Sequence, residues 1–221
     1  MERFPIRVTL LANAGVLIRY RGVSLLLDGI FGQKDNPFSP LPEGCREAML
    51  RGAQVTLVSG PVDLPLVPFV ETRPVTTAAD MFRAVRDLLP ATDVLIKAAA
   101  VADYRPAQVA SDKMKKSDQD LSIPLERTDD ILGWVAEHRH PGLFVCGFSM
   151  ETRDMVANSR AKLERKKLDM IVANNLKVAG AGFGTKTNVV TLITREGERE
   201  LPLMGKDQVA AHLLDEIQRR R

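Results

Sequence analysis

The sequence predicts an α/β fold, a Rossmann-like three-layer sandwich with a mostly parallel central sheet. Short, wholly apolar segments have the composition of strands that are buried on both faces; they are residues 54–58, 94–96, 143–148 and 168–173. Segments with helical periodicity alternate with these strands, at residues 77–89, 128–139, 154–167 and 207–220. Strands that alternate with helices form crossover units, and crossover units build parallel sheets with helices on both faces.

The first 44 residues depart from this pattern, and we expect an atypical β-rich segment there. Stretches rich in leucine and β-branched residues predict strands at residues 8–11, 15–20 and 24–28. Arg21-Gly22 is a tight-turn signal, so the segment contains a β-hairpin. The composition changes near Cys45, where a short helix is expected. The chain therefore divides into residues 1–44 and a larger domain over residues 45–221.

Local signals support the helices of the larger domain. The apolar positions of residues 77–89 share one face; they are Ala78, Met81, Phe82, Val85, Leu88 and Leu89. Thr128 is expected to cap the next helix, with Asp129 and Asp130 in the first turn, where the helix dipole favours anions. A Gly-rich loop over residues 178–188 precedes two strands joined by a hairpin turn, at residues 189–194 and 201–203.

Composition excludes several classes of partner. The net charge is +3, from 31 basic and 28 acidic residues, which is too mild to indicate nucleic acid. The basic residues are clustered, and that pattern favours a small anionic ligand. The two cysteines, Cys45 and Cys146, allow neither a disulfide framework nor a zinc site, and Cys146 is expected to be a buried thiol. No apolar stretch is long enough for a membrane helix, so we expect a cytoplasmic protein without a membrane partner.

Ligands of parallel α/β sheets bind beyond the carboxyl ends of the strands, so the residues that follow each strand are the candidate site. Lys97 is followed by Ala98, Ala99 and Ala100, whose small side chains let a flat ligand approach the backbone. Asp103 comes next and is a candidate metal ligand. The alternative is a close helix–strand contact in which Asp103 is a cap.

Two basic clusters are candidates for phosphate binding. Lys113, Lys115 and Lys116 lie in one loop, and Lys162 and Lys166 project from one helix face while Arg165 is expected on another. The alternative for both clusters is a solvated surface, with the helical lysines paired to nearby carboxylates.

Two further strand ends carry candidate groups. Phe148 can stack on a base, although it can equally belong to the core. Asn174-Asn175 places amide groups at the expected ligand edge, and the alternative is a turn signal.

A series of motifs resembles the bacterial phosphopantothenate–cysteine ligases over residues 53–221. The most specific is Ala-Ala-Val-Ala-Asp-Tyr-Arg-Pro at residues 99–106; the others are Lys-Met-Lys-Lys at 113–116, Leu-Glu-Arg-Thr-Asp-Asp-Ile-Leu at 125–132, Gly-Phe-Ser-Met-Glu-Thr at 147–152, Lys-Leu-Glu-Arg-Lys at 162–166, Ala-Asn-Asn at 173–175 and Gly-Phe-Gly-Thr-Lys-Thr-Asn at 182–188. In bacteria this ligase is the C-terminal half of a bifunctional protein that also carries a flavin-dependent decarboxylase, a domain not expected in this chain.

The resemblance implies a ligase of coenzyme A biosynthesis that uses CTP and Mg²⁺ to join 4'-phosphopantothenate to cysteine through an acyl-cytidylate. It also implies a homodimer. By position, Lys97, Ala98 and Ala99 would meet the cytosine, and Asp103 would hold the metal ion and act with Lys113 in catalysis. The remaining residues of the implied nucleotide site are Asp129, Asp130, Ile131, Leu132, Phe148, Lys162 and Lys166. Residue types alone do not separate CTP from ATP.

Residues 1–52 match neither the Gly-rich loop nor the Ser-Asn segment with which this family begins. They resemble instead the opening strands of metallo-β-lactamase-fold hydrolases, at Leu-Ala-Asn-Ala-Gly-Val-Leu-Ile (11–18) and Leu-Leu-Asp-Gly-Ile-Phe (26–31). The metal-binding histidine cluster of that fold is missing, because His138-Arg139-His140 is followed by Pro141. The alternative to an active ligase is therefore a chimera or a catalytically impaired nucleotide-binding remnant.

Overall fold

The computed structural model describes residues 8–12, 15–20, 23–28, 54–62, 70–109, 112, 122–151, 153–175, 178, 181 and 185–221. Its strands are β1 (Val8–Ala12), β2 (Gly15–Tyr20), β3 (Val23–Asp28), β4 (Gln54–Ser59), β5 (Glu71–Pro74), β6 (Val94–Lys97), β7 (Tyr104–Pro106), β8 (Leu125–Arg127), β9 (Phe144–Glu151), β10 (Met170–Asn175), β11 (Thr187–Thr194) and β12 (Glu198–Gly205). Its helices are α2 (Ala78–Leu88), α3 (Ile131–His138), α4 (Met155–Arg165), α5 (Lys206–Arg219) and the 3-10 turn η1 (Leu89–Ala91).

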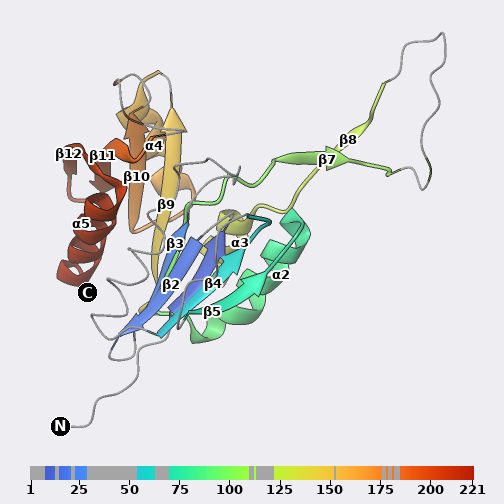
Figure 1. The fold of residues 1–221 in the computed structure, drawn as a ribbon, viewed down its shortest axis with the longest axis horizontal. Helices are drawn as coiled ribbons and strands as arrows, with labels where there is room; N and C mark the ends of the chain where they lie inside the picture. Colours follow the sequence, from blue (N-terminus) through green and yellow to red (C-terminus); the bar gives the residue numbers. More distant parts are fainter. Residues whose placement is uncertain are drawn as a thin grey trace.

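The strands form two five-stranded sheets, ordered β3-β2-β1-β4-β5 and β12-β11-β10-β9-β6. In each sheet the parallel neighbours run from the central strand to one edge: β1 with β4 and β4 with β5 in the first, and β10 with β9 and β9 with β6 in the second. The antiparallel pairs of these sheets are β1–β2, β2–β3 and β2–β4 on the N-terminal side, and β10–β11 and β11–β12 on the C-terminal side. The predicted fold class, a Rossmann-like α/β fold with mostly parallel central strands, is confirmed (Figure 1).

Strands β6, β9 and β10 are apolar because both of their faces are covered, as their composition predicted. Ile96, Cys146 and Val172 are each fully buried within them. Cys146 is a free thiol, and its burial raises the pKa of that thiol well above its ordinary value. Helix α2 buries the predicted face through Met81 and Val85, so the expected apolar periodicity is confirmed.

The start of α3 corrects a sequence prediction. Thr128 does not cap the helix; its hydroxyl donates instead to the carbonyl oxygen of Ala102, at 2.6 Å. The cap is Asp130, whose Oδ1 accepts the N–H of Gly133 at 3.0 Å. Both residue types cap helices well, but only Asp130 lies directly before the first helical residue, Ile131.

The pairing of β7 with β8 forms a short antiparallel ribbon that the sequence analysis did not anticipate. The ribbon projects from the body of the molecule (Figure 1). It is clamped by an ion pair between Arg105 and Glu126, at 2.7 Å. Tyr104 and Leu125 are about half exposed or more on it, at 51% and 60%.

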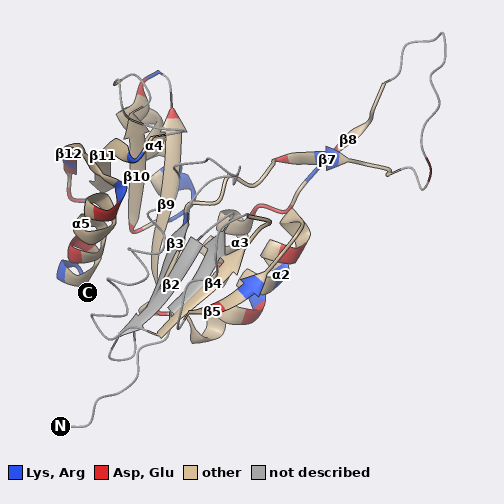
Figure 2. Ribbon diagram, viewed as in Figure 1, with Lys and Arg blue, Asp and Glu red and all other residues tan. Residues whose placement is uncertain are grey.

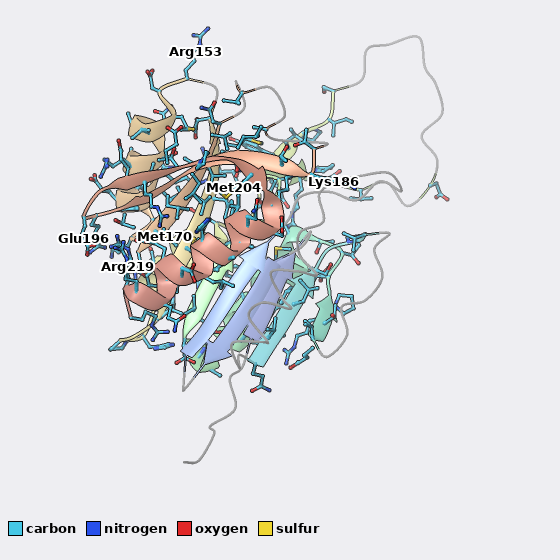
Figure 3. All side chains as sticks on the ribbon, turned by 60° about the vertical axis from the view of Figure 1, so that its left-hand side comes forward. Arg153, Met170, Lys186, Glu196, Met204 and Arg219 are labelled. Atoms are coloured by element: carbon cyan, nitrogen blue, oxygen red, sulfur yellow. The ribbon has the colours of Figure 1, made fainter. Side chains whose placement is uncertain are left out.

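Helix α5 lies against the β11–β12 hairpin and closes the C-terminal edge of the molecule (Figure 3). Glu216 is buried there and accepts hydrogen bonds from Arg219 and Arg220, while Arg220 also pairs with Glu196. Burial acts to raise the pKa of Glu216, but the two arginines outweigh it and hold that pKa below its ordinary value. No described helix is long and apolar enough to cross a membrane.

Candidate functional site

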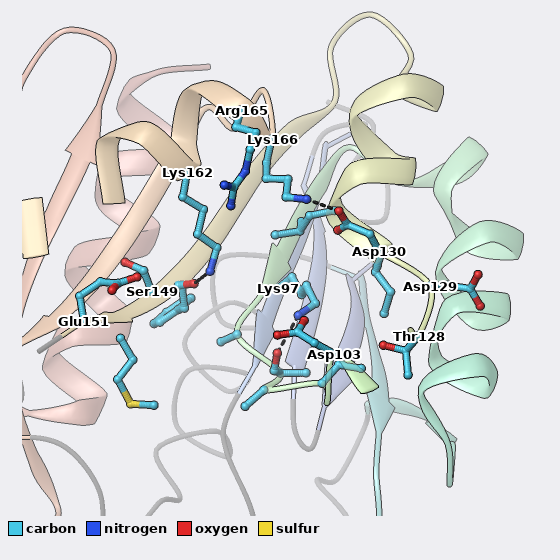
Figure 4. A pocket seen from close by; sticks show the side chains of 18 of the residues that line it. Lys97, Asp103, Thr128, Asp129, Asp130, Ser149, Glu151, Lys162, Arg165 and Lys166 are labelled. Carbon is cyan, nitrogen blue, oxygen red and sulfur yellow. Dashed lines mark hydrogen bonds and ion pairs between the residues drawn. The ribbon is translucent and has the colours of Figure 1, made fainter. Parts of the chain in front are cut away.

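A cavity of about 640 Å³ opens at the carboxyl ends of β6, β9 and β10. Its walls come from the loop after β6, the start of α3, the end of β9 and the last turns of α4 (Figure 4). It is lined by Lys97, Ala98, Ala99, Ala100, Val101, Asp103, Tyr104, Arg127, Thr128, Asp129, Asp130, Ile131, Leu132, Phe148, Ser149, Met150, Glu151, Lys162, Arg165, Lys166 and Asn174.

The loop after β6 is held in place by hydrogen bonds to its backbone carbonyl oxygens. The Nζ of Lys97 donates to the carbonyl oxygen of Ala99 at 2.7 Å, and Ala98 and Ala99 are both buried. The backbone N–H of Thr128 donates to the carbonyl oxygen of Asp103 at 3.0 Å, which ties the loop to the approach to α3. The side chain of Asp103 lines the cavity, as the binding hypothesis requires.

The start of α3 forms a second wall. Asp130 caps the helix and also pairs with the Nζ of Lys166 across the cavity (Figure 4). Partial burial acts to raise the pKa of Asp130, but the hydrogen bonds from Lys166 and the Gly133 N–H outweigh it, so the pKa is lowered. Ile131 and Leu132 are buried beneath the cap and form the apolar floor.

Helix α4 supplies a basic wall. The Nζ of Lys162 donates to the carbonyl oxygen of Phe148 at 2.9 Å, and burial lowers the pKa of Lys162. Lys166 lies one turn further along the helix, and Arg165 lines the same cavity. Arg165 was expected on another helix face, and that expectation is wrong, because a position three residues after Lys162 still shares its side of a helix.

The cavity is mixed in charge, with the basic groups concentrated on one side. The acidic side chains that line it are Asp103, Asp129, Asp130 and Glu151, and the basic ones are Lys97, Arg127, Lys162, Arg165 and Lys166. Figure 4 shows Lys162, Arg165 and Lys166 on one side of the cavity with Asp130 facing Lys166, and Figure 2 shows that α2 and α5 also carry both basic and acidic positions. Such a site can bind an anion against α4 and hold a neutral ring near Phe148.

The structure brings together every described residue of the predicted site. Eleven of the twelve predicted residues line the cavity, and the twelfth, Lys113, lies outside the described residues. Phe148 packs on the core, as one interpretation predicted, and it also lines the cavity; its stacking on a base stays a prediction. Of the two amides at the end of β10, Asn174 lines the cavity.

Sequence reasoning missed Arg127 and Tyr104. Both belong to the β7–β8 ribbon, where they stand opposite each other at its base, and both line the cavity. The signal for Arg127 was its place in the Glu-Arg-Thr-Asp-Asp run, three residues before the helix cap Asp130, which also lines the cavity.

A divalent cation would find one carboxylate near the small-residue loop rather than a ready-made cage. Within the described residues no group of three or more His, Cys, Asp or Glu side chains could hold a metal ion. Mg²⁺ in nucleotide sites is bound by one or two carboxylates together with phosphate oxygens and water. Asp103 fits that mode of binding.

The fold and the cavity define a class: Rossmann-like α/β domains that bind their ligand beyond the carboxyl ends of parallel strands. Within it, the chain belongs to the DFP family, the DNA/pantothenate metabolism flavoprotein C-terminal domain, whose sequence model matches residues 45–220.

Relatives of known name agree with this family. The chain is 46% identical over 175 residues to the coenzyme A biosynthesis bifunctional protein CoaBC of Bacillus subtilis (strain 168), a match that covers 77% of this chain and 42% of that protein. It is 41% identical over 173 residues to CoaBC of Escherichia coli (strain K12), covering 77% of this chain and 43% of that protein. The chain thus spans less than half the length of these relatives.

The structure also resembles a crystal structure of the C-terminal domain of CoaBC. The TM-score is 0.71 at 31% sequence identity, and the match covers 97% of this chain and 96% of that one. The structural likeness therefore extends before Cys45, the residue at which the match to the family's sequence model begins.

Proposed function

We propose that this chain catalyses the CTP-dependent ligation of 4'-phosphopantothenate to cysteine, a step of coenzyme A biosynthesis. The observation that carries the proposal is the joint position of Lys162, Arg165 and Lys166 along one wall of a cavity in a DFP-family domain. The CoaBC relatives named above support the choice of reaction.

The reaction has two steps, and the residues of the cavity suit both. In the first step a carboxylate oxygen of phosphopantothenate attacks the α-phosphorus of CTP, so that pyrophosphate leaves and an acyl-cytidylate forms. In the second step the amine of cysteine attacks the acyl carbon, an amide forms, and CMP leaves with the bonding electron pair while the amine loses a proton to solvent. The protein's task is to neutralise phosphate charge and to align the reactants.

Individual roles follow from position. Lys162, Arg165 and Lys166 bind the phosphates, and Phe148 lies against the base or ribose. The N-terminus of α3 faces the cavity with its backbone N–H groups, with Asp129 and Asp130 beside the nucleotide and Ile131 and Leu132 below it. Lys97, Ala98 and Ala99 contact the base through the loop they form, and Lys113 completes the triphosphate site.

Mg²⁺ belongs to this proposal as the companion of the nucleotide. Asp103 would be the protein ligand of the ion, and oxygen atoms of the triphosphate would be further ligands. When bound, the ion would neutralise negative charge on the phosphates and make pyrophosphate a better leaving group.

Partners follow the same proposal. The small-molecule partners are CTP, 4'-phosphopantothenate and cysteine. We also propose a homodimer in the cytosol and, in the longer relatives, a decarboxylase domain next to this one. The half-exposed Tyr104 and Leu125 on the β7–β8 ribbon favour self-association, which light scattering of the purified protein would test.

A second candidate is a nucleotide-binding domain without ligase activity. The observation that favours it is the sequence before residue 53, which lacks the Gly-rich and Ser-Asn segments found at the start of this family. A chimera would produce this arrangement, and resequencing the gene from source DNA would expose a junction created during cloning.

One experiment separates the candidates. Purified protein receives phosphopantothenate, CTP, Mg²⁺ and cysteine; pyrophosphate and CMP are measured, and CTP binding is followed by calorimetry. Cysteine-dependent CMP release is the expected result, and the Lys162→Met variant, which keeps an apolar stem of similar length, is expected to lose it. Binding of CTP without CMP release would favour the second candidate, and absence of binding would refute both.

A further inference from the structure

The side chains of Asn174 and Asn188 form a short hydrogen-bonded chain next to the cavity. Asn174 is on β10 and stands opposite Val190 of β11, so Asn188 is its diagonal neighbour on the next strand. The Nδ2 of Asn188 donates to the Oδ1 of Asn174 at 2.9 Å. The motif that contains Asn188, at residues 182–188, has no role in the reaction as proposed above.

The orientation of Asn188 is fixed by the backbone. Its Oδ1 accepts the N–H of Val189 at 2.9 Å. A backbone N–H can only donate, so the atom that faces it must be the oxygen of the amide, and the NH₂ group must point the other way.

An irregularity in the β11–β12 ladder allows this contact. The register shifts between Asn188 and Val190, and the stretch of β12 that faces the shift contains Pro202, which has no N–H to donate. The extra residue lies on β12, and next to this bulge the amide of Asn188 turns to the backbone of its own strand and to Asn174.

The orientation of Asn174 follows from that of Asn188. Because its Oδ1 receives the NH₂ of Asn188, its own Nδ2 is turned away from β11. Asn174 lines the cavity, and among the described residues none accepts a hydrogen bond from its Nδ2. A half-buried NH₂ group is thus left to donate to a ligand.

We propose that Asn188 is a positioning residue, which orients the amide of Asn174 so that its NH₂ group donates to an acceptor atom of the nucleotide in the cavity. The inference rests on the proposed function, because it names the nucleotide as the occupant. Asn188 does not touch the ligand itself; it acts through Asn174.

Two substitutions of Asn188 test whether this residue orients the amide of Asn174 or only packs against it. Asn188→Asp keeps an oxygen for the Val189 N–H but presents a second oxygen to Asn174, so the Asn174 amide turns over and shows its oxygen to the ligand. Asn188→Ala removes the contact and leaves the Asn174 amide free to rotate. We expect N188D to weaken CTP binding about tenfold or more and N188A to weaken it by less, since one hydrogen bond is worth roughly that factor.

Asn174→Ala provides the matched background. In that background, N188D and N188A are expected to change the Kd for CTP by less than about twofold, because the residue through which Asn188 acts is absent. If the loss in N188D came instead from repulsion between its new carboxylate and phosphate, it would persist undiminished in N174A/N188D, and that result would overturn the proposal. Thermal unfolding confirms that each variant is folded.

Two readouts go beyond affinity. Protonation gives the new carboxyl group of N188D a donor, so lowering the pH restores CTP binding relative to N188A at the same pH; parallel pH profiles for the two variants would count against the orientation role. In the ligand-free protein, ¹⁵N spectra should show slow exchange of the Asn188 NH₂ proton that is donated to Asn174, and faster exchange of that proton in N174A.

The spectra also separate the two proposals. If the unchanged protein fails to bind CTP while the Asn188 protons are protected, the nucleotide function fails and the amide orientation stands. If CTP binds but those protons exchange as fast as in N174A, the positioning role is refuted and the proposed function is untouched.

Discussion

Replacing Asp130 tests how one side chain divides its effect between a helix cap and an ion pair. Its Oδ1 caps α3 through the Gly133 N–H, and its Oδ2 pairs with Lys166. Asp130→Asn retains the cap and removes the charge, whereas Asp130→Ala removes both. Comparison of the two variants gives the contribution of each contact to the free energy of unfolding.

The size of each effect follows from exposure. The side chain of Asp130 is 58% exposed and that of Lys166 is 18% exposed, so the ion pair is partly screened and contributes at most about 1 kcal/mol. Loss of an Asp cap to Ala costs about 1 kcal/mol, and Asn caps as well as Asp does. Hence we expect Asp130→Asn to lower the free energy of unfolding by about 0.5–1 kcal/mol and Asp130→Ala by about 1.5–2 kcal/mol.

The pH dependence carries a definite sign. The pKa of Asp130 is lowered in the folded protein from its ordinary value, 3.8, because the Lys166 and Gly133 hydrogen bonds outweigh the effect of burial. A carboxylate with a lowered pKa stabilises the fold above its unfolded pKa, and that stabilisation is lost as the pH falls through the folded pKa. The difference between the unchanged protein and Asp130→Asn should thus be full at neutral pH and vanish in acid.

Urea unfolding at pH 7 measures the free energy of unfolding that each variant loses, and urea unfolding below pH 3.8 measures how much of the ion-pair contribution disappears in acid. The comparison requires that the slope of free energy against urea concentration is the same for all variants. Gly133 is a poor control, since a Cβ there would lie 2.6 Å from the Asp130 Oδ2. Arg83→Ala serves better, because it removes an exposed ion pair with Asp80 on α2 and should cost less. Equal losses in Asp130→Asn and Asp130→Ala would refute the division, because the cap would then contribute nothing.

Further predictions concern the packing of β9 and the basic wall of the cavity. Ser149→Ala leaves the buried hydroxyl of Ser159 without its 2.6 Å partner and should cost about 1–3 kcal/mol by urea unfolding, with S149A/S159A costing less than the sum of the single changes. Burial lowers the pKa of Lys162, so CTP affinity should fall with rising pH before an ordinary lysine would lose its proton, and Lys162→Arg should remove that fall in a calorimetric pH series. Gly147→Ala places a Cβ 2.8 Å from the Cδ1 of the fully buried Leu168, which should lower stability by about 1–3 kcal/mol; an unchanged melting temperature would contradict that packing.

The central strands could be predicted from the sequence, because burial on both faces of a strand directly determines its composition. A strand segment buried on both faces must be apolar, and β9 is apolar over residues 144–148 and β10 over residues 170–173. The short strands β5 and β7 have no such signal: Glu-Thr-Arg-Pro and Tyr-Arg-Pro are largely exposed, and only their partners make them strands. Tertiary pairing of this kind is invisible to local patterns.

The candidate site was predictable for a related reason. Parallel strands bring their carboxyl ends to one edge, so residues far apart in sequence, such as Asp103 and Asn174, meet at one cavity. The sequence did not show which hydrogen-bond partner each of these side chains would have. Thr128 and Asp130 are both suitable caps, and the choice between them depends on the carbonyl of Ala102, which lies 26 residues away.

The way in which the cavity lysines are held bears on how an anion would bind. Lys97 and Lys162 each donate to a backbone carbonyl, a dipole without net charge, whereas Lys166 donates to a carboxylate. A carbonyl orients an ammonium group yet leaves its positive charge largely in force, and such preorganised charge is the most effective kind for binding a developing anion. A phosphate at Lys166 must compete with Asp130, while at Lys162 it need displace only a neutral acceptor, so Lys162→Met should weaken CTP binding more than Lys166→Met.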